Sequence, residues 1–137
     1  MILQTSTCKI GGKLKRLALV FWMGMLLGCS DNIPVTNLPA QLILAAYDSN
    51  GGLVSERSIG ADDPAYQRLQ ALLEAHPTGW KTSYASYVTG PYVFRADSLT
   101  IRCYKDAIGI DVKEGEKSTS KRKPIQHVPQ SLGLPST

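Results

Sequence analysis

The stretch DDPAYQRLQALLEAHPTG, residues 62–79, predicts one amphipathic helix, and the remaining elements can be interpreted around it. Asp63 suits the N-cap, and Pro64 suits the first helical position, where its missing N–H costs nothing. Pro77 and Gly79 end the pattern. Residues of one helical face recur with the i, i+3, i+4, i+7 spacing, at Tyr66, Leu69, Leu72, Leu73 and His76. We therefore expect a helix from Pro64 to about His76 with that face on a core.

The residues before this helix predict a β-hairpin. Gln41–Tyr47 (QLILAAY) is apolar on both faces, which is typical of a buried central strand. Asp48–Gly52 (DSNGG) supplies residues that tolerate a positive φ and so favours a turn. Leu53–Ile59 (LVSERSI) follows as a more polar return strand.

The residues after the helix predict further strands. Trp80–Thr89 is rich in aromatic residues, Thr and Val, and Gly90-Pro91 breaks it. Tyr92–Phe94 is a short apolar piece. Apolar residues then alternate with polar ones over 99–104 and again over 108–113, around a tight turn near Lys105-Asp106. Two matched alternations joined by a short turn indicate a hairpin with one buried face.

This order, β-β-α-β-β-β, predicts a two-layer α+β domain over residues 41–113. One amphipathic helix would cover one face of a mostly antiparallel sheet of four to five strands, and the other face would be wetted. Residues 114–137 are rich in Ser, Thr, Lys, Pro and Gly and have few large apolar side chains, so we expect a mobile polar tail there.

The N-terminal residues have the layout of a secretory signal. A positive region, with Lys9, Lys13, Lys15 and Arg16, precedes the uncharged apolar run Leu17–Leu27. That run is shorter than the roughly 20 residues that span a bilayer. A signal anchor or a buried N-terminal helix is the alternative interpretation.

The end of the apolar run, Leu26-Leu27-Gly28-Cys29, resembles the lipobox of bacterial lipoproteins, although Leu27 is bulkier than most lipoboxes carry at that position. The resemblance implies a signal peptide over 1–28, diacylglyceryl transfer to Cys29, and a membrane-anchored chain that begins at Cys29. Residues 29–40 would then be a tether to the membrane. Ser30 follows the cysteine and Asp31 comes only after it, which by the same resemblance favours the periplasmic leaflet of the outer membrane. The periplasmic face of the inner membrane is the alternative.

Charge and cysteine content narrow the function classes. The chain has 15 Lys and Arg against 11 Asp and Glu, but four of the basic residues precede Cys29, which leaves a mature chain of 109 residues with eleven of each sign. A nucleic-acid-binding role is therefore not expected.

Cys103 is the one cysteine after Cys29, so the mature domain has no internal disulfide. Its apolar surroundings favour a core role over a reactive thiol.

No catalytic, metal or cofactor site is predicted. His76 and His127 lie far apart, without a cysteine or carboxylate cluster at ligand spacing. His76 is better explained by the partial negative charge at the helix C-terminus. The pair Asp62/Asp63 resembles an acid–base pair, but its place before Pro64 favours helix capping.

The aromatic residues between 80 and 94 are the one suggestive cluster: Trp80, Tyr84, Tyr87, Tyr92 and Phe94. In a strand, Tyr87 would lie on the face opposite Trp80 and Tyr84. Exposed tyrosine near arginine is typical of binding surfaces, so we predict a surface that contains Tyr87, Tyr92 and Arg102. The alternative is that all these aromatic residues belong to the core or the sheet surface.

The stretch from Asp63 to Val112 has a capped helix ending at Gly79-Trp80, a Ser-Tyr-x-Ser-Tyr run at 83–87, a Gly/Pro break and two alternating strands. It resembles small bacterial lipoproteins, some of which act as periplasmic immunity proteins against secreted toxins. The resemblance implies a non-enzymatic lipoprotein that binds a protein partner, with a secreted toxin as the candidate. An accessory lipoprotein of an envelope assembly is the first alternative, and a small envelope hydrolase is the remote one.

Overall fold

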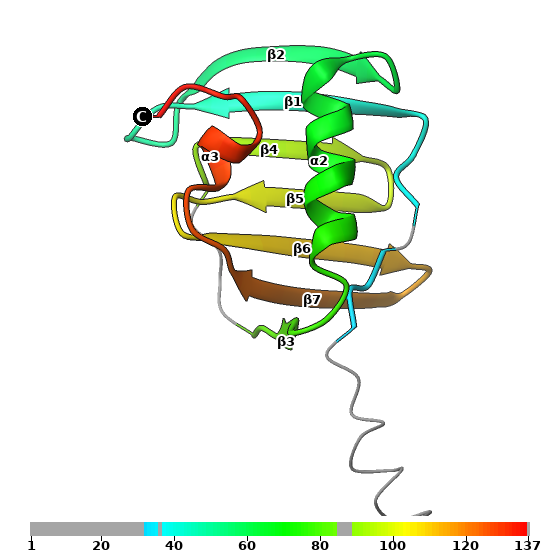
Figure 1. The fold of residues 1–137 in the computed structure, drawn as a ribbon. Coiled ribbons are helices and arrows are strands. Elements are labelled where there is room, and N and C mark those ends of the chain that lie inside the picture. Colours follow the sequence, from blue (N-terminus) through cyan, green and yellow to red (C-terminus); the bar gives the residue numbers. More distant parts are fainter. Residues whose placement is uncertain (1–31, 36, 85–88, 137) are drawn as a thin grey trace, which may run out of the picture. The chain divides into compact units, whose positions relative to one another are not determined.

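The computed structural model describes residues 32–35, 37–84 and 89–136. These residues form one antiparallel sheet and two helices, α2 and α3 (Figure 1). In chain order the elements are β1 (Gln41–Tyr47), β2 (Leu53–Gly60), α2 (Pro64–Ala75), β3 (Lys81–Thr82), β4 (Tyr92–Ala96), β5 (Leu99–Cys103), β6 (Ala107–Glu114), β7 (Lys117–Pro124) and α3 (Val128–Ser131).

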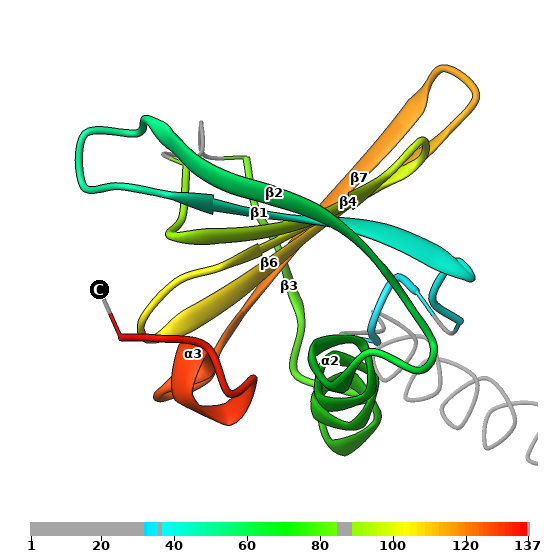
Figure 2. The same ribbon diagram turned by 90° about the horizontal axis from the view of Figure 1, so that it is seen from above.

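The sheet has seven strands in the order β2-β1-β4-β5-β6-β7-β3, and each neighbouring pair is antiparallel. Both helices lie on the same face of the sheet, as Figure 2 shows from above. The predicted α+β class and the antiparallel sheet are confirmed. The predicted number of four to five strands is wrong, and the second helix was not predicted.

Helix α2 follows the prediction closely. The Asp63 side chain accepts a hydrogen bond from the Ala65 N–H at 2.8 Å and so caps the helix, with Pro64 in the first turn. Leu69 is fully buried and Leu73 nearly so. At the other end, the Trp80 Nε1–H donates to the His76 carbonyl at 2.6 Å, which satisfies a carbonyl at the helix terminus.

The β1–β2 hairpin is also confirmed, with Leu42 opposite Ile59. The Asp48 Oδ1 accepts hydrogen bonds from the N–H groups of Asn50 and Gly52 and holds the turn. Strand β1 is the second strand from the sheet edge, because β2 is the edge strand. Its Ile43 is 36% exposed, so β1 is not buried on both faces as predicted.

The predicted hairpin over 99–113 is confirmed as β5 and β6. The apolar members of the two alternations point towards the helices and form the centre of the core. These members are Leu99, Ile101, Cys103, Ile108 and Ile110. They share this layer with Leu42 of β1, Leu69 of α2, Phe94 of β4 and Trp80, which follows α2.

The prediction of a mobile tail over 114–137 is wrong. Strand β7 pairs with β6 from Glu114↔Lys117 to Ala107↔Pro124, and α3 follows it. Ile125, Val128 and Leu132 are buried. The prediction failed because β7 is held by backbone hydrogen bonds, which its polar side chains do not reveal, while the few apolar residues after it are all placed in the core.

The prediction of a free tether over 29–40 is also wrong for the described part. Ile33, Val35 and Leu38 pack against the core. The Ile33 N–H donates to the Pro77 carbonyl at 2.9 Å, beyond the C-terminal end of α2. The segment that precedes β1 is therefore part of the folded domain from Asn32 onwards.

Among the described residues of the predicted strand over Trp80–Thr89, which are 80–84 and 89, strand pairing forms at Lys81–Thr82, where β3 pairs with β7. Trp80 is fully buried, whereas Tyr84 is 94% exposed, although the alternation placed both on one face. Residues 85–88 lie outside the described residues, and so does the predicted signal peptide with its lipobox. No helix within the described ranges is long and apolar enough to cross a bilayer.

Candidate functional site on the open face of the sheet

No described helix covers the face of the sheet opposite α2 and α3 (Figure 2). Polar and charged side chains lie on this face. We call it the open face. The strand register places Thr100, Asp111 and Ser120 in one row across β5, β6 and β7. Arg102 occupies the next outward-facing position of β5. The alternation that buries Ile101 and Ile110 on one side therefore sends these polar residues to the other side.

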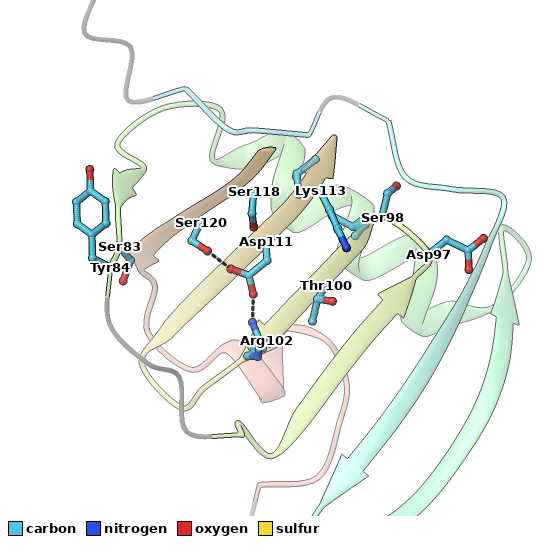
Figure 3. Close-up of a pocket in the computed structure, with 12 residues that line it drawn as sticks. Ser83, Tyr84, Asp97, Ser98, Thr100, Arg102, Asp111, Lys113, Ser118 and Ser120 are labelled. Carbon is cyan, nitrogen blue, oxygen red and sulfur yellow. Dashed lines mark hydrogen bonds and ion pairs between the residues drawn. The ribbon is translucent and has the colours of Figure 1, made fainter. Parts of the chain in front are cut away.

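The Asp111 carboxylate is the centre of this row (Figure 3). One of its oxygens accepts a hydrogen bond from the Ser120 hydroxyl, and the other pairs with the Arg102 guanidinium. The Arg102 and Asp111 side chains are 26% and 20% exposed, so the pair is partly desolvated. Partial burial strengthens a charge pair relative to a fully exposed one. The three side chains therefore form a fixed polar cluster in the middle of the open face.

This cluster forms the floor of a hollow of about 470 Å³. The Lys113 side chain bends over β6 into the hollow, and Ser118 lies beside it (Figure 3). The charged groups that line the hollow balance, with Arg102 and Lys113 against Asp97 and Asp111. A lining with both signs of charge and several hydroxyl groups suits a polar surface of a protein partner rather than a strongly charged small ion.

Tyr84 lies at the rim of the hollow and its ring projects away from the sheet (Figure 3). It is 94% exposed, which makes it the most exposed large apolar side chain among the described residues. Tyrosine is enriched at protein interfaces because its ring supplies contact area while its hydroxyl supplies a hydrogen bond. The rim therefore offers an aromatic anchor beside a polar hollow.

A second ion pair extends the polar character of the open face towards β2. Arg95 on β4 pairs with Glu56 on β2, across the intervening strand β1. Ile43 lies on the same face between them and is 36% exposed. The open face therefore combines fixed charge pairs with a small apolar area.

The predicted binding residues have different outcomes. Arg102 lies on the open face, as expected of a surface residue. Tyr92 does not: it is 6% exposed, points into the core, and its hydroxyl donates to the Pro135 carbonyl at 2.8 Å. Burial raises the pKa of Tyr92. Tyr87 and Cys29 lie outside the described residues.

The environments of Cys103 and His76 favour structural roles for both residues. Cys103 is fully buried, which confirms its predicted core position, and burial raises the pKa of its thiol. The charged form of His76 was expected to be favoured by the helix C-terminus. Instead, burial and the nearby Lys123 charge lower the pKa of His76, so the neutral ring is favoured. In the described ranges, no group of three or more His, Cys, Asp or Glu residues could hold a metal ion.

The sequence interpretation missed Asp111, Ser120 and Lys113 as members of the site. The alternation over 108–113 already placed Asp111 on the polar face of its strand. Ser118 and Ser120 were missed because residues after 113 were assigned to a tail. A strand prediction for β7 would have brought the row together.

Comparison of the chain with protein-family models, with curated proteins and with solved structures finds no match.

Proposed function

We propose that this chain is a membrane-anchored bacterial lipoprotein that works by binding another protein through the open face of its sheet. The observation that carries the binding role is the juxtaposition of an almost fully exposed tyrosine, Tyr84, with a polar hollow built on Arg102 and Asp111. The lipid anchor rests on the lipobox resemblance of Leu26-Leu27-Gly28-Cys29.

The layered fold supports binding by this face. Its other face is occupied, because α2, α3 and the segment around Ile33 pack there. Interfaces commonly combine an aromatic anchor with a polar surround that excludes water. The fixed Arg102–Asp111–Ser120 cluster would present such a surround without the entropy cost of ordering long side chains on binding.

A toxin is the partner that the family resemblance favours, which would make the chain a periplasmic immunity protein. A binder that blocks a toxin needs a preformed surface rather than catalytic groups. The open face has that character, since its charges are neutralised within the face itself.

Acylation is tested by growing cells with labelled fatty acid. The wild type should incorporate label and Cys29→Ala should not. Outer-membrane placement is tested by fractionation of the same cells. Equal label in both proteins would overturn the lipoprotein proposal, and cofractionation with inner-membrane markers would overturn the outer-membrane placement.

Binding is tested by in vivo cross-linking and copurification of a stoichiometric partner, with a toxin encoded beside this gene as the first candidate. Tyr84→Ala and Lys113→Glu should each lower recovery, since loss of an interface anchor of about 2 kcal/mol weakens binding about thirtyfold. Gln70→Ala, on the exposed side of α2, is the matched control and should bind as the wild type does. Equal recovery with all three variants would place the interface elsewhere.

A further inference from the structure

The edge of the sheet formed by β7 and β3 is strongly basic, although the charges of the mature chain as a whole balance. Lys81 and Arg122 are exposed, and Lys121 and Lys123 are partly exposed. We call these four residues the basic edge. In the predicted mobile tail over 114–137, the charges of Lys121, Arg122 and Lys123 would have been dispersed. Strand pairing fixes them along one edge of the sheet, with Lys81 and Arg122 on the open face and Lys121 and Lys123 on the face that the helices cover.

Backbone register places two of these charges against each other. Lys81 lies directly opposite Arg122 in the β3–β7 pair. Like charges at opposed positions of neighbouring strands destabilise the pair. The Arg122 guanidinium lies 5.0 Å from the centroid of the Tyr104 ring, a cation–π contact that favours the charged group at this position. An anion placed against this edge would offset the repulsion.

The basic edge is also where the chain enters the domain. The Lys121 ammonium donates to the Asn32 carbonyl at 3.0 Å, and the Ile33 N–H donates to the Pro77 carbonyl. Asn32 is only three residues from Cys29. Because one residue spans at most about 3.3–3.6 Å, Asn32 lies within about 11 Å of the Cys29 backbone along any path of the chain.

We propose that the basic edge binds the anionic phospholipid headgroups of the membrane that holds the anchor. The inference rests on the proposed acylation of Cys29, because the Lys121 ammonium donates to the carbonyl of Asn32, three residues from the acylated residue. The domain would then contact the bilayer directly, with β3 and β7 at the headgroups, and would not be held by a flexible linker alone.

The expected strength follows from the charges. A basic side chain near an anionic membrane surface strengthens binding about fivefold, and the attraction falls off within a Debye length. Four such residues next to a lipid anchor would keep the basic edge in contact with the headgroups for most of the time at physiological salt. Loss of one charge should weaken this contact, and high salt should abolish it.

The test uses the processed protein purified from membranes and reconstituted into vesicles of phosphatidylcholine alone, or of phosphatidylcholine with about one-third phosphatidylglycerol. Flotation of the vesicles measures whether the protein is attached to the membrane. Hydrogen exchange measures whether the basic edge contacts the headgroups. We expect exchange at 81–83 and 117–124 to slow about threefold or more in the anionic vesicles, and to recover in about 1 M NaCl, where the Debye length is about 3 Å. Exchange at 41–60 should not depend on the lipid.

Arg122→Glu should remove most of the protection, and Lys81→Glu should reduce it. Arg68→Glu is the matched control, since it makes the same charge change at an exposed position of α2. Unchanged exchange at 41–60 in each variant shows that the domain is still folded.

The outcomes separate the two proposals. If the protein floats with both vesicles but shows no lipid-dependent protection, it has its lipid anchor, and the proposal that the basic edge binds headgroups is wrong. Equal loss of protection in Arg122→Glu and Arg68→Glu also contradicts that proposal, because net charge alone would then explain the effect. If the protein floats only with anionic vesicles and is protected at β7, headgroup binding is supported and the lipid anchor is contradicted. Flotation with neither vesicle contradicts both proposals.

Discussion

Replacement of Leu132 by alanine tests whether the last twenty residues belong to the core. Leu132 follows the short helix α3 and is fully buried. The substitution removes three carbon atoms, worth about 0.8 kcal/mol each in transfer free energy, and leaves a cavity beneath α3. Because α3 lies near the end of the chain and can partly collapse, we expect a loss in the free energy of unfolding of about 2–4 kcal/mol.

The assay is thermal unfolding followed by circular dichroism. At about 4 °C per kcal/mol for a domain of this size, Leu132→Ala should lower the Tm by roughly 8–16 °C. Gln130→Ala is the control, since Gln130 is an exposed residue of the same helix, and surface substitutions usually change stability by under about 0.5 kcal/mol. Equal Tm values for the wild type and Leu132→Ala would show that α3 does not pack on the sheet and would restore the mobile tail.

Three further substitutions and one control test other parts of the fold. Leu69→Ala should cost about 2–5 kcal/mol and Gln70→Ala almost nothing, and similar Tm shifts for both would mean that the helical phase is wrong. Asp63→Ala should cost about 1 kcal/mol through the lost cap. The hydrogen bond from Arg57, and to a smaller extent the one from the Ala65 N–H, lowers the pKa of Asp63 below its ordinary 3.8, so the stabilisation by the ionised carboxylate is complete above pH 3.8 and is lost as the pH falls through the lowered value. The stability difference between wild type and Asp63→Ala should therefore shrink in acid, and a constant difference would show that the ionised carboxylate stabilises neither the cap nor the Arg57 pair. Tyr92→Phe should cost about 1 kcal/mol because it leaves a carbonyl of the C-terminal segment without its donor; an unchanged Tm would show that the hydroxyl is solvated instead.

The elements that could be predicted are those in which side-chain periodicity and local end signals agree. The α2 helix has an N-cap at Asp63, a proline after it and leucines on one face, so both ends and the buried side follow from local rules. The β5–β6 hairpin has two alternations in register, Ile101 opposite Ile110. In both cases the sequence pattern of the element itself identifies which of its faces is buried.

The β7 strand could not be predicted in this way, because its sequence KSTSKRKP contains no large apolar residue. Its place in the sheet is set by a partner, β6, through backbone hydrogen bonds that any residue except proline can make. Two of its lysines, Lys121 and Lys123, donate through their ammonium groups to the carbonyls of Asn32 and Thr78. From the propensities of these residues alone, a disordered tail is predicted.

The candidate site was only partly predictable for the same reason. Arg102 could be assigned to the surface from the alternation of β5. Ser120, which donates to the Asp111 carboxylate that Arg102 pairs with, belongs to the unpredicted strand. Tyr92 was misplaced because its exposure depends on which sheet face the helices cover. Its position opposite Cys103 in the β4–β5 register puts both residues on the covered face.

The two proposed surfaces are compatible in one orientation of the domain. The basic edge is the β3–β7 side of the sheet, whereas β2 is the opposite edge, six strand spacings away. At about 4.8 Å per spacing, β2 would stand about 29 Å above the headgroups. The open face would then rise roughly perpendicular to the bilayer, with Tyr84 near the membrane and the exposed Val54 near the top. A partner could therefore cover the hollow without lifting the basic edge from the membrane. Partner binding that released the protection at 117–124 would show that the two surfaces compete and that this orientation is wrong.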